Sequence, residues 1–415
     1  MIELKVLGAG QEVGRSGFLV DTGVEKFLLD YGLSTQNMAI PLEAPINLDA
    51  VFLSHAHLDH CGMVPSLYTR GYTGKVYGTK TTLDIATLLL MDAIKVQRLK
   101  GIEPYYHTHD VATFHHLYKK VGFGEKLDFV VSSVQLRDAG HIPGSSTILI
   151  EAHGKKLLYT GDIKYTDTPL MKGMDTDFKD IDLLICESTY SSKNHPDREK
   201  LKHRLIEKIK ETMERGGTIL LPSFAVARTQ EVLLMVYNLG YPVYMDGMGI
   251  DVTKEMLHEK EAVSDHEKLK EAFGSANKIK KSTQRKDVLK KPSIVIASAG
   301  MLQAGPIHSY IQKLYNREDC RLILTGYQAE GTPGRALLDK KVFTINGEHL
   351  NVKMDVEFMD FSAHIGRDDL LKFIEKVNPR IVVPVHGDHT KEFAHELKQK
   401  GIEAHALKNG ETIRV

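Results

Sequence analysis

The sequence has no tryptophan, few cysteines and no excess of charge. Among its 415 residues, 54 lysines and arginines balance 54 aspartates and glutamates. The three widely spaced cysteines, Cys61, Cys186 and Cys320, give no support to a disulfide framework and favour a reducing compartment, so we expect a cytoplasmic protein. Balanced charge argues against a protein that coats nucleic acid by bulk attraction. Low net charge combined with 42% hydrophobic residues also excludes a disordered chain.

Long apolar runs are absent as well. No stretch approaches the roughly 20 apolar residues that a membrane-spanning helix needs. The segment MIELKVLGAGQEVG has none of the features of a signal peptide. We therefore expect no membrane partner. The length is sufficient for two or three domain-sized units with a large core.

Two kinds of pattern alternate along the chain. Up to about residue 190, short apolar stretches such as AVFLSH and KLLYTGD predict strands, and residues 82–98 predict the first long helix. From there to about residue 358, strand and helix patterns alternate, which is typical of βαβ units and a parallel sheet. The last part again contains strands that end in polar residues. These patterns predict an α/β protein.

The strongest chemical signal is a cluster of histidines directly after the apolar strand AVFLS. It reads His55-Ala-His57-Leu-Asp59-His60. Imidazole nitrogens and carboxylate oxygens are good zinc ligands, and a turn after a strand lets closely spaced side chains converge. The alternative is a chance cluster. From the composition alone, however, such a pattern should arise in only about a few chains per thousand. The spacing therefore predicts a metal site.

Three further polar residues follow strand-like segments: His141 in DAGHIPGSS, Asp162 in LLYTGD and His386 in IVVPVHGD. Taken singly, each is more often a turn or cap residue. Together with the histidine cluster they complete seven ligands, which is what two metal ions need. A carboxylate such as Asp162 can bridge two ions held about 3.5–4 Å apart.

These residues resemble known motifs over essentially the whole chain. Asp30, the His55–His60 cluster, His141 and Asp162 match, in order, the four metal motifs of the metallo-β-lactamase superfamily. Three later motifs resemble its β-CASP branch of nucleases, namely Glu187 in CESTY, His364 in FSAH and His386 in PVHGD. Segments such as PSFAVARTQE and GYQAEGTPGR are most similar to the group that contains the 73 kDa subunit of cleavage and polyadenylation specificity factor and its prokaryotic relatives.

The resemblance implies a fold and two Zn²⁺ ions. The fold would be a four-layer αββα sandwich formed by residues 1–190 and 360–415, with a β-CASP domain, a parallel sheet flanked by helices, inserted at 191–359. We expect neither the N-terminal KH region of longer archaeal relatives nor the extra C-terminal domain of RNase J. The ligands implied for one ion are His55, His57 and His141. Those implied for the other are Asp59, His60 and His386, with Asp162 bridging and Asp30 orienting the ligands.

The resemblance also implies that His364, paired with Glu187, is the general acid at the leaving group, so that these two residues and Asp59 form the catalytic set. A histidine held by a carboxylate can supply the proton that a departing 3′-oxygen needs. Read without the resemblance, Glu187 is a cap of the turn after a buried strand and His364 is a core histidine. The resemblance favours the catalytic interpretation.

The inserted segment is expected to cover the metal cleft and select a polymer. Its candidate RNA-phosphate residues lie in loops after strands, where backbone N–H groups and arginines can receive phosphate: Ser223, Arg228, Ser298, Gly300 and Arg335. The glycines could equally serve tight turns, and the arginines could form surface ion pairs. The run from Lys278 to Lys291 has seven basic residues and one aspartate. It is either a solvated segment or an edge that steers RNA.

Two other groups are interpreted as structural. His107, His109, His115 and His116 are expected to be surface or packing residues. Cys61 adjoins the histidine cluster, but seven ligands are already present, so it is expected to pack.

The leading hypothesis is a zinc-dependent ribonuclease that hydrolyses RNA phosphodiester bonds, mainly by internal cleavage of single-stranded regions. Some relatives also degrade RNA from the 5′ end, so both modes stay open. One alternative is a small-molecule hydrolase of the lactamase or thioesterase type on the same metal centre. Another is a non-catalytic partner in an RNA-processing complex. In relatives the C-terminal region can pair protomers, so a homodimer is a further expectation.

Overall fold

The computed structural model describes residues 1–345 and 347–415. The chain divides into two compact units. Unit 1 contains Met1–Asp167, Met171–Asn194 and Ala363–Val415, and unit 2 contains Thr168–Leu170 and His195–Ser362. From the sequence, the inserted domain is predicted at 191–359. No helix in the described residues is long and apolar enough to cross a membrane.

Unit 1 is built on two seven-stranded sheets. The first has the order β22 (Thr412–Arg414), β1 (Glu3–Gly8), β2 (Gly17–Asp21), β3 (Lys26–Tyr31), β4 (Ala50–Phe52), β5 (Val76–Gly78) and β6 (Tyr118–Lys120). The second has the order β21 (Glu403–Ala404), β20 (Ile381–Val385), β11 (Leu183–Glu187), β10 (Lys155–Tyr159), β9 (Ser146–Ala152), β8 (Ser132–Asp138) and β7 (Lys126–Asp128).

Alternation of side chains along the strands builds two cores on the faces of the second sheet. On β10, Leu157 and Tyr159 belong to the core shared with the first sheet, whereas Leu158 faces the other way. On β11, Leu183 and Ile185 likewise join the inner core. Successive residues of a strand point to opposite faces, so a strand that is apolar throughout must be covered on both sides.

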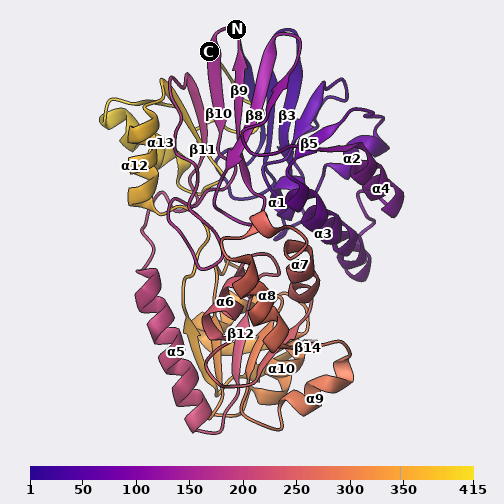
Figure 1. Cartoon of the computed structure of the whole chain (residues 1–415), viewed down its shortest axis with the longest axis vertical. Helices are drawn as coiled ribbons and strands as arrows, with labels where there is room; N and C mark the ends of the chain where they lie inside the picture. The colour runs from indigo at the N-terminus through magenta and orange to yellow at the C-terminus, as the bar shows by residue number, and fades with distance from the viewer. Residues whose placement is uncertain (346) are drawn as a thin grey trace. The chain divides into compact units, whose positions relative to one another are not determined.

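Helices cover the outer face of each sheet in unit 1, as Figure 1 shows. On the side of the first sheet lie α1 (Leu58–Cys61), α2 (Pro65–Thr69), α3 (Lys80–Leu99) and α4 (Thr108–Leu117). On the side of the second lie α12 (Arg367–Val377) and α13 (Thr390–Gln399), whose apolar residues pack into its outer core. The expected αββα sandwich is confirmed, and α3 confirms the helix predicted at 82–98.

Strand direction in the second sheet decides where its polar residues gather. β10, β11 and β20 are parallel neighbours, and β8 runs in the same direction because β9 is antiparallel to both β8 and β10. The carboxyl ends of β8, β10, β11 and β20 therefore lie at one edge. His141, Asp162, Glu187 and His386 all stand at or just beyond these ends.

Unit 2 contains a six-stranded sheet in which all neighbours are parallel. Its order is β14 (Asn277–Ile279), β13 (Val243–Asp246), β15 (Ile294–Ala297), β12 (Ile219–Pro222), β16 (Arg321–Leu324) and β19 (Asp355–Phe358). Its α-helices are α5 (Arg198–Glu214), α6 (Arg228–Val236), α7 (Gly249–Met256), α8 (His266–Ser275), α9 (Arg285–Val288), α10 (Ile307–Leu314) and α11 (Pro333–Lys340). Two short 3₁₀ helices (Lys260–Ala262 and Ser282–Gln284) and the hairpin of β17 (Val342–Ile345) with β18 (Glu348–Asn351) complete it. The parallel sheet confirms the βαβ pattern of the sequence.

A buried ion-pair network ties the start of α5 to α6 inside unit 2. The Glu231 carboxylate pairs with both Arg198 and Arg228, and Arg198 also donates to the carbonyl oxygen of Ser362 at 2.5 Å. The side chains of Glu231 and Arg228 are only 4% and 6% exposed. Glu231 thus compensates two largely buried cations.

We expect Glu231→Gln to lower the free energy of unfolding by about 3 kcal/mol, because removing one partner leaves buried charge uncompensated. Chemical denaturation measures this. The matched control is Glu199→Gln, whose carboxylate is 64% exposed and pairs with Lys202 at 3.3 Å. An exposed pair contributes only about 0–1 kcal/mol. Equal effects of the two substitutions would contradict the prediction.

Candidate metal centre

The histidine cluster follows β4 and forms the turn into α1. Its backbone is held close to the start of β2, because Ser16, which directly precedes that strand, donates its N–H to the carbonyl oxygen of Asp59 at 2.7 Å. A Cβ at Gly32 would lie 1.8 Å from that same oxygen, so the chain after β3 needs glycine to pass the turn. His55 and His60 are buried within it. A short turn thereby directs several side chains toward one point.

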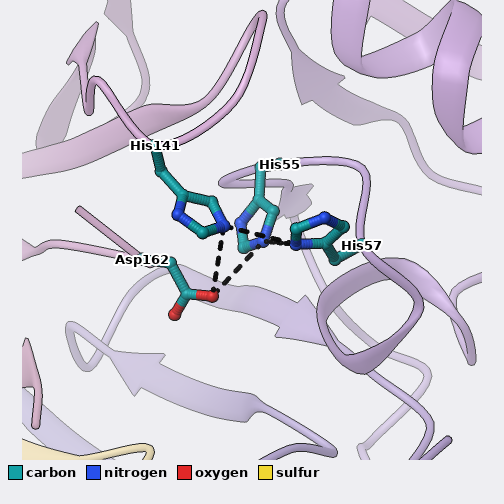
Figure 2. Close-up of side chains that lie close together, drawn as sticks. All are labelled: His55, His57, His141 and Asp162. Atoms are coloured by element: carbon teal, nitrogen blue, oxygen red, sulfur yellow. Dashed lines mark hydrogen bonds and ion pairs between the residues drawn. The ribbon is translucent and has the colours of Figure 1, made fainter. Parts of the chain in front are cut away.

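One group of donors surrounds Asp162, as Figure 2 shows. Its ligand atoms lie within 4.8 Å of one another and come from His55, His57, His141 and Asp162. Asp162 Oδ2 lies 3.5 Å from His55 Nε2 and 3.7 Å from His141 Nε2. His57 Nδ1 lies 3.2 Å from His55 Nε2 and 3.3 Å from His141 Nε2. Nitrogens from three separate histidines thus face a common centre.

A second group shares the same carboxylate. It consists of Asp59, His60 and His386, with His386 Nε2 at 3.3 Å from Asp59 Oδ2. Asp162 Oδ2 is 3.4 Å from His60 Nε2, and Asp162 Oδ1 is 3.5 Å from His386 Nδ1. Asp162 therefore lies between the two groups, which is the position that a bridging carboxylate occupies.

Two observations test whether this donor set fits a metal. Asp162 Oδ1 is buried and has no hydrogen-bond partner among the described residues, a costly state for a carboxylate unless a cation completes it. His57 Nδ1 lies close to both His55 Nε2 and His141 Nε2, and protons on these rings cannot give every one of the three nitrogens its own hydrogen bond. Three nitrogens and one carboxylate oxygen are a zinc donor set. The residues fit a metal site.

The charges and burial of the protein without a metal ion shift the pKa values of the histidines in opposite directions. Burial lowers the pKa of His55 and of His141 well below the usual range, so both rings are neutral and able to act as ligands. Burial also lowers the pKa of His60, but the charges of Asp162 and Asp30 outweigh it and raise that pKa well above its usual range. Burial raises the pKa of Asp162, yet His386 and His60 bring it well below its ordinary value. The carboxylate is therefore ionised.

Asp30 supports this centre from behind. It accepts hydrogen bonds from Ser54 N at 2.7 Å and Ser54 Oγ at 2.6 Å, and from Tyr159 OH at 2.6 Å. Its Oδ2 also lies 2.7 Å from His60 Nδ1, which turns His60 Nε2 toward Asp162. With its oxygens occupied in this way, Asp30 orients a ligand and is itself absent from the metal-binding groups among the described residues.

Asp30 and His386 both have positive φ angles, 55° and 51°. Residues other than glycine rarely adopt this backbone conformation, and it costs of order 1–3 kcal/mol. The surrounding contacts must hold it: Asp30 by the bonds just described, and His386 by Thr189, whose Oγ1 donates to the His386 carbonyl oxygen at 2.9 Å and lies 3.1 Å from its Nδ1. Two residues of the candidate site thus adopt a backbone conformation that their contacts must stabilise.

His364 and Glu187 also meet at this edge of the sheet. His364 Nδ1 lies 3.1 Å and 3.2 Å from the two carboxylate oxygens of Glu187. Burial lowers the pKa of His364, but Glu187 and Asp162 outweigh it and raise the pKa to about 9. Glu187 also accepts the N–H of Ile163 at 2.8 Å, so it supports the turn after β10 as well. The structural and the catalytic interpretation of Glu187 are compatible.

Several supporting contacts were not foreseen from the sequence. Lys164 is buried and donates to the carbonyl oxygen of His364 at 3.0 Å, which fixes the loop that carries this histidine. His141 Nδ1 contacts the carbonyl oxygen of Ala363 at 2.9 Å in the same loop. Ser54, Tyr159 and Thr189 likewise support ligands. Only Lys164 gave a signal that could have been used, a lysine two residues after a candidate ligand.

The candidate RNA-phosphate residues lie in unit 2, and three of their loops meet at the carboxyl edge of its sheet. Ser223 follows β12, and its Oγ lies 3.2 Å from Thr325 Oγ1, which follows β16. A Cβ at Gly300, after β15, would lie 3.0 Å from Phe224 N, so these loops are in close contact. Ser298 is the first residue after β15 and lies on the same loop as Gly300.

The two arginines differ. Arg228 is buried and paired with Glu231, so it forms an internal ion pair in place of the surface pair considered from the sequence. Arg335 lies on α11 and is 48% exposed, with Asp339 at 2.7 Å. A surface ion pair of this kind is weak and can exchange for another anion. A phosphate role for these five residues stays a prediction.

Other candidate residues lie outside the metal-binding groups. His107 precedes α4, while His109, His115 and His116 are exposed on it. Cys61 is buried and donates its Sγ–H to the carbonyl oxygen of Ala56 at 3.2 Å. Within residues 1–345 and 347–415, none of these side chains joins a metal-binding group.

Three family models match the chain. A beta-lactamase superfamily domain matches residues 17–215, a Beta-Casp domain matches 229–337, and a Zn-dependent metallo-hydrolase RNA specificity domain matches 349–407. The first match contains every candidate ligand except His386. The last contains His386 and His364. The candidate centre is thus assembled from two matched domains that are far apart in the sequence.

Curated relatives match along the whole chain. The probable RNase MJ4 of Methanocaldococcus jannaschii is 37% identical over 100% of both chains. The RNase aCSPSF2 of Saccharolobus solfataricus is 38% identical, over 99% of this chain and 85% of the relative. The transcription termination factor FttA of M. jannaschii is 33% identical, over 96% of this chain and 69% of the relative. A crystal structure of a protein of unknown function from Enterococcus faecalis V583 has the same fold, with a TM-score of 0.66, 17% identity and full coverage of both chains.

We expect Asp30→Asn to weaken zinc binding by about 10–100-fold, because the amide cannot accept from Ser54, Tyr159 and His60 at once. Competition with a chromophoric chelator measures the affinity, and circular dichroism monitors folding. The control is Asp128→Asn, which changes a carboxylate that is 77% exposed. Unchanged zinc affinity in the folded Asp30→Asn protein would remove the orienting role.

Proposed function

This chain belongs to the metallo-β-lactamase superfamily and, within it, to the β-CASP ribonucleases, and from that premise we propose that it hydrolyses RNA phosphodiester bonds at a zinc centre. The observation that carries the proposal is Asp162. Its carboxylate is buried, its Oδ1 has no hydrogen-bond partner among the described residues, and five histidine side chains lie within 4.0 Å of it. A metal-dependent hydrolase needs such a site.

We further propose two zinc ions. The first would be held by His55, His57 and His141. The second would be held by Asp59, His60 and His386, and Asp162 would be shared. When bound, zinc lowers the pKa of water toward neutrality and withdraws charge from phosphoryl oxygens. The two groups of donors and the position of Asp162 between them support this number of ions.

The chain's own residues account for the leaving group. Hydrolysis breaks the bond between phosphorus and the 3′-oxygen, and that oxygen must gain a proton. With Nδ1 held by Glu187, the Nε2 atom of His364 delivers the proton. In the protein without a metal ion, Glu187 and Asp162 outweigh burial and raise the pKa of His364 to about 9, which favours the protonated ring at neutral pH. Lys164 fixes the backbone of His364, so the ring is positioned before substrate arrives.

The substrate and mode of cleavage rest on the relatives and on general chemistry. Two relatives are named as RNases and one as a transcription termination factor, and the matched C-terminal domain is described as an RNA specificity domain. We propose cleavage mainly within single-stranded RNA, with degradation from the 5′ end as the alternative mode. A homodimer and a cytoplasmic location stay predictions.

Replacing two ligands tests the enzyme class. We expect Asp59→Asn combined with His60→Ala to abolish cleavage of RNA and reduce bound zinc, because both residues lie in one donor group. Elemental analysis measures zinc, and RNA labelled at either end reports cleavage and its position. The control replaces two exposed residues, Asp128→Asn and His395→Ala. Full activity in the purified double variant would end the proposal.

The same assay separates the alternatives. Hydrolysis of a β-lactam or thioester by a zinc-loaded protein that leaves RNA intact would favour a small-molecule hydrolase. Bound zinc without activity on any of these substrates would favour a non-catalytic partner. Internal fragments from both labelled ends indicate internal cleavage, whereas release of mononucleotides from the 5′ end indicates trimming.

Replacing His364 tests the proton donor. We expect His364→Ala to lower kcat on RNA by about 10²–10⁴-fold with little change in zinc content. Bis-p-nitrophenyl phosphate has a leaving group that needs no proton, so its hydrolysis should fall far less. His389→Ala, an exposed histidine near the start of α13, is the control. Equal losses on both substrates would assign His364 to substrate binding or structure instead.

A further inference from the structure

The basic run from Lys278 to Lys291 is an ordered part of unit 2. It contains the last two residues of β14, the 3₁₀ helix Ser282–Gln284 and α9; Figure 1 labels β14 and α9. β14 is the end strand of the sheet and pairs with β13. Lys278 lies 4.3 Å from the centre of the Phe273 ring and donates to the Phe273 carbonyl oxygen. Lys278 is therefore engaged in contacts within unit 2, unlike a fully solvated lysine.

Arg285 anchors the run to the sheet. Its Nε lies 2.7 Å and its Nη2 3.3 Å from the two oxygens of Asp246, the last residue of β13. Asp246 is buried and also accepts from Tyr310 OH at 2.9 Å. This paired, planar contact holds the segment in place, so Arg285 is structural and its charge is already compensated.

The turn before Arg285 is fixed as well. Gln284 Oε1 accepts the backbone N–H groups of both Lys280 and Lys281, at 2.8 Å and 2.9 Å. These two lysines therefore project from an ordered turn. They directly follow the carboxyl end of β14, because β14 ends at Ile279.

Four lysines of the run have exposed side chains and no carboxylate within ion-pair distance among the described residues: Lys280, Lys281, Lys286 and Lys291. The remaining exposed lysine, Lys290, pairs with Asp287 at 2.6 Å. In a chain of zero net charge, four like charges within twelve positions form a local excess of positive charge that attracts anions.

The position of the lysines identifies the kind of anion. Because the six strands of the sheet are parallel, the turn after β14 lies at the same edge as the loops after β13, β15 and β12. Those loops carry Ser298 and Ser223. Of the four lysines, Lys280 and Lys281 lie at this edge, whereas Lys286 is on α9 and Lys291 stands three residues before β15, toward the amino end of that strand. An extended polyanion that contacts the loops at this edge and then follows the run could therefore reach all four lysines. A single phosphate could not.

We propose that Lys280, Lys281, Lys286 and Lys291 form a contact site for the phosphate backbone of RNA, separate from the metal centre and independent of base sequence. The proposal rests on the proposed function for its substrate class. The lysines raise the affinity and the association rate for long RNA, whereas the chemical step at the metal centre does not require them. Arg285 and Gln284 hold the site in shape.

The test compares the holoenzyme with a variant in which these four lysines are changed to glutamine. A phosphorothioate oligonucleotide keeps the backbone charge and resists hydrolysis, so its binding is followed by fluorescence anisotropy over a range of salt. Single-stranded nucleic acid loses about 0.7 in the slope of log K against log salt for each phosphate contact, so we expect a slope shallower by up to about 3. Hydrolysis of bis-p-nitrophenyl phosphate should be unchanged.

The matched control changes four other exposed lysines, Lys119, Lys120, Lys398 and Lys400 in unit 1, and gives the same net charge. An unchanged slope in the first variant, or an equal change in the control, overturns the site. Binding is measured apart from cleavage. A wild-type protein that binds RNA through these lysines but does not cleave it would therefore contradict the proposed function and leave the contact site standing.

Discussion

The buried carboxylate of Asp162 is the constraint on which the site depends. A carboxylate that is out of water must be compensated, and here the compensation comes from histidines of the turn after β4 and of the loops after β8 and β20. Each of these segments is at the site because its strand ends at the same edge of the sandwich. The sheets thus do more than form a core: the shared direction of their strands brings the candidate ligands together, and Asp30 fixes the orientation of His60.

The proposed acid is attached to this centre by a different route. His364 comes from the segment that returns from unit 2 to unit 1, about 200 residues after Asp162 in the sequence. It is held by Glu187 through its ring and by Lys164 through its backbone. Residues at or after the ends of two strands, β11 and β10, therefore hold one imidazole beside the donor groups. Such redundant support is what a proton donor needs, because a small displacement of the ring would lengthen its path to the leaving oxygen.

Apolar runs predicted the strands well, since a strand buried on both faces is apolar throughout, as β11 and β20 are. The helices that frame the metal turn were harder to predict. α1 and α2 contain only 4 and 5 residues, too few to show a helical period, and α4 carries the exposed histidines that left no apolar stripe. The basic run looked uniform as a sequence, yet it divides into an anchor, Arg285, and lysines without carboxylate partners, because only the fold places Asp246 beside it.

The sequence by itself determined the chemistry of the centre: residue types, spacing and order of the His55–His60 turn and of Asp162 set out the donors and the family. The tertiary structure decided how those donors are used. Among the described residues it left Asp162 Oδ1 without a hydrogen-bond partner, occupied both oxygens of Asp30, and buried Arg228 against Glu231. Spacing along a chain fixes only which groups are available. Burial and strand direction fix which of them remain open to a metal or a phosphate, and neither can be read from local sequence.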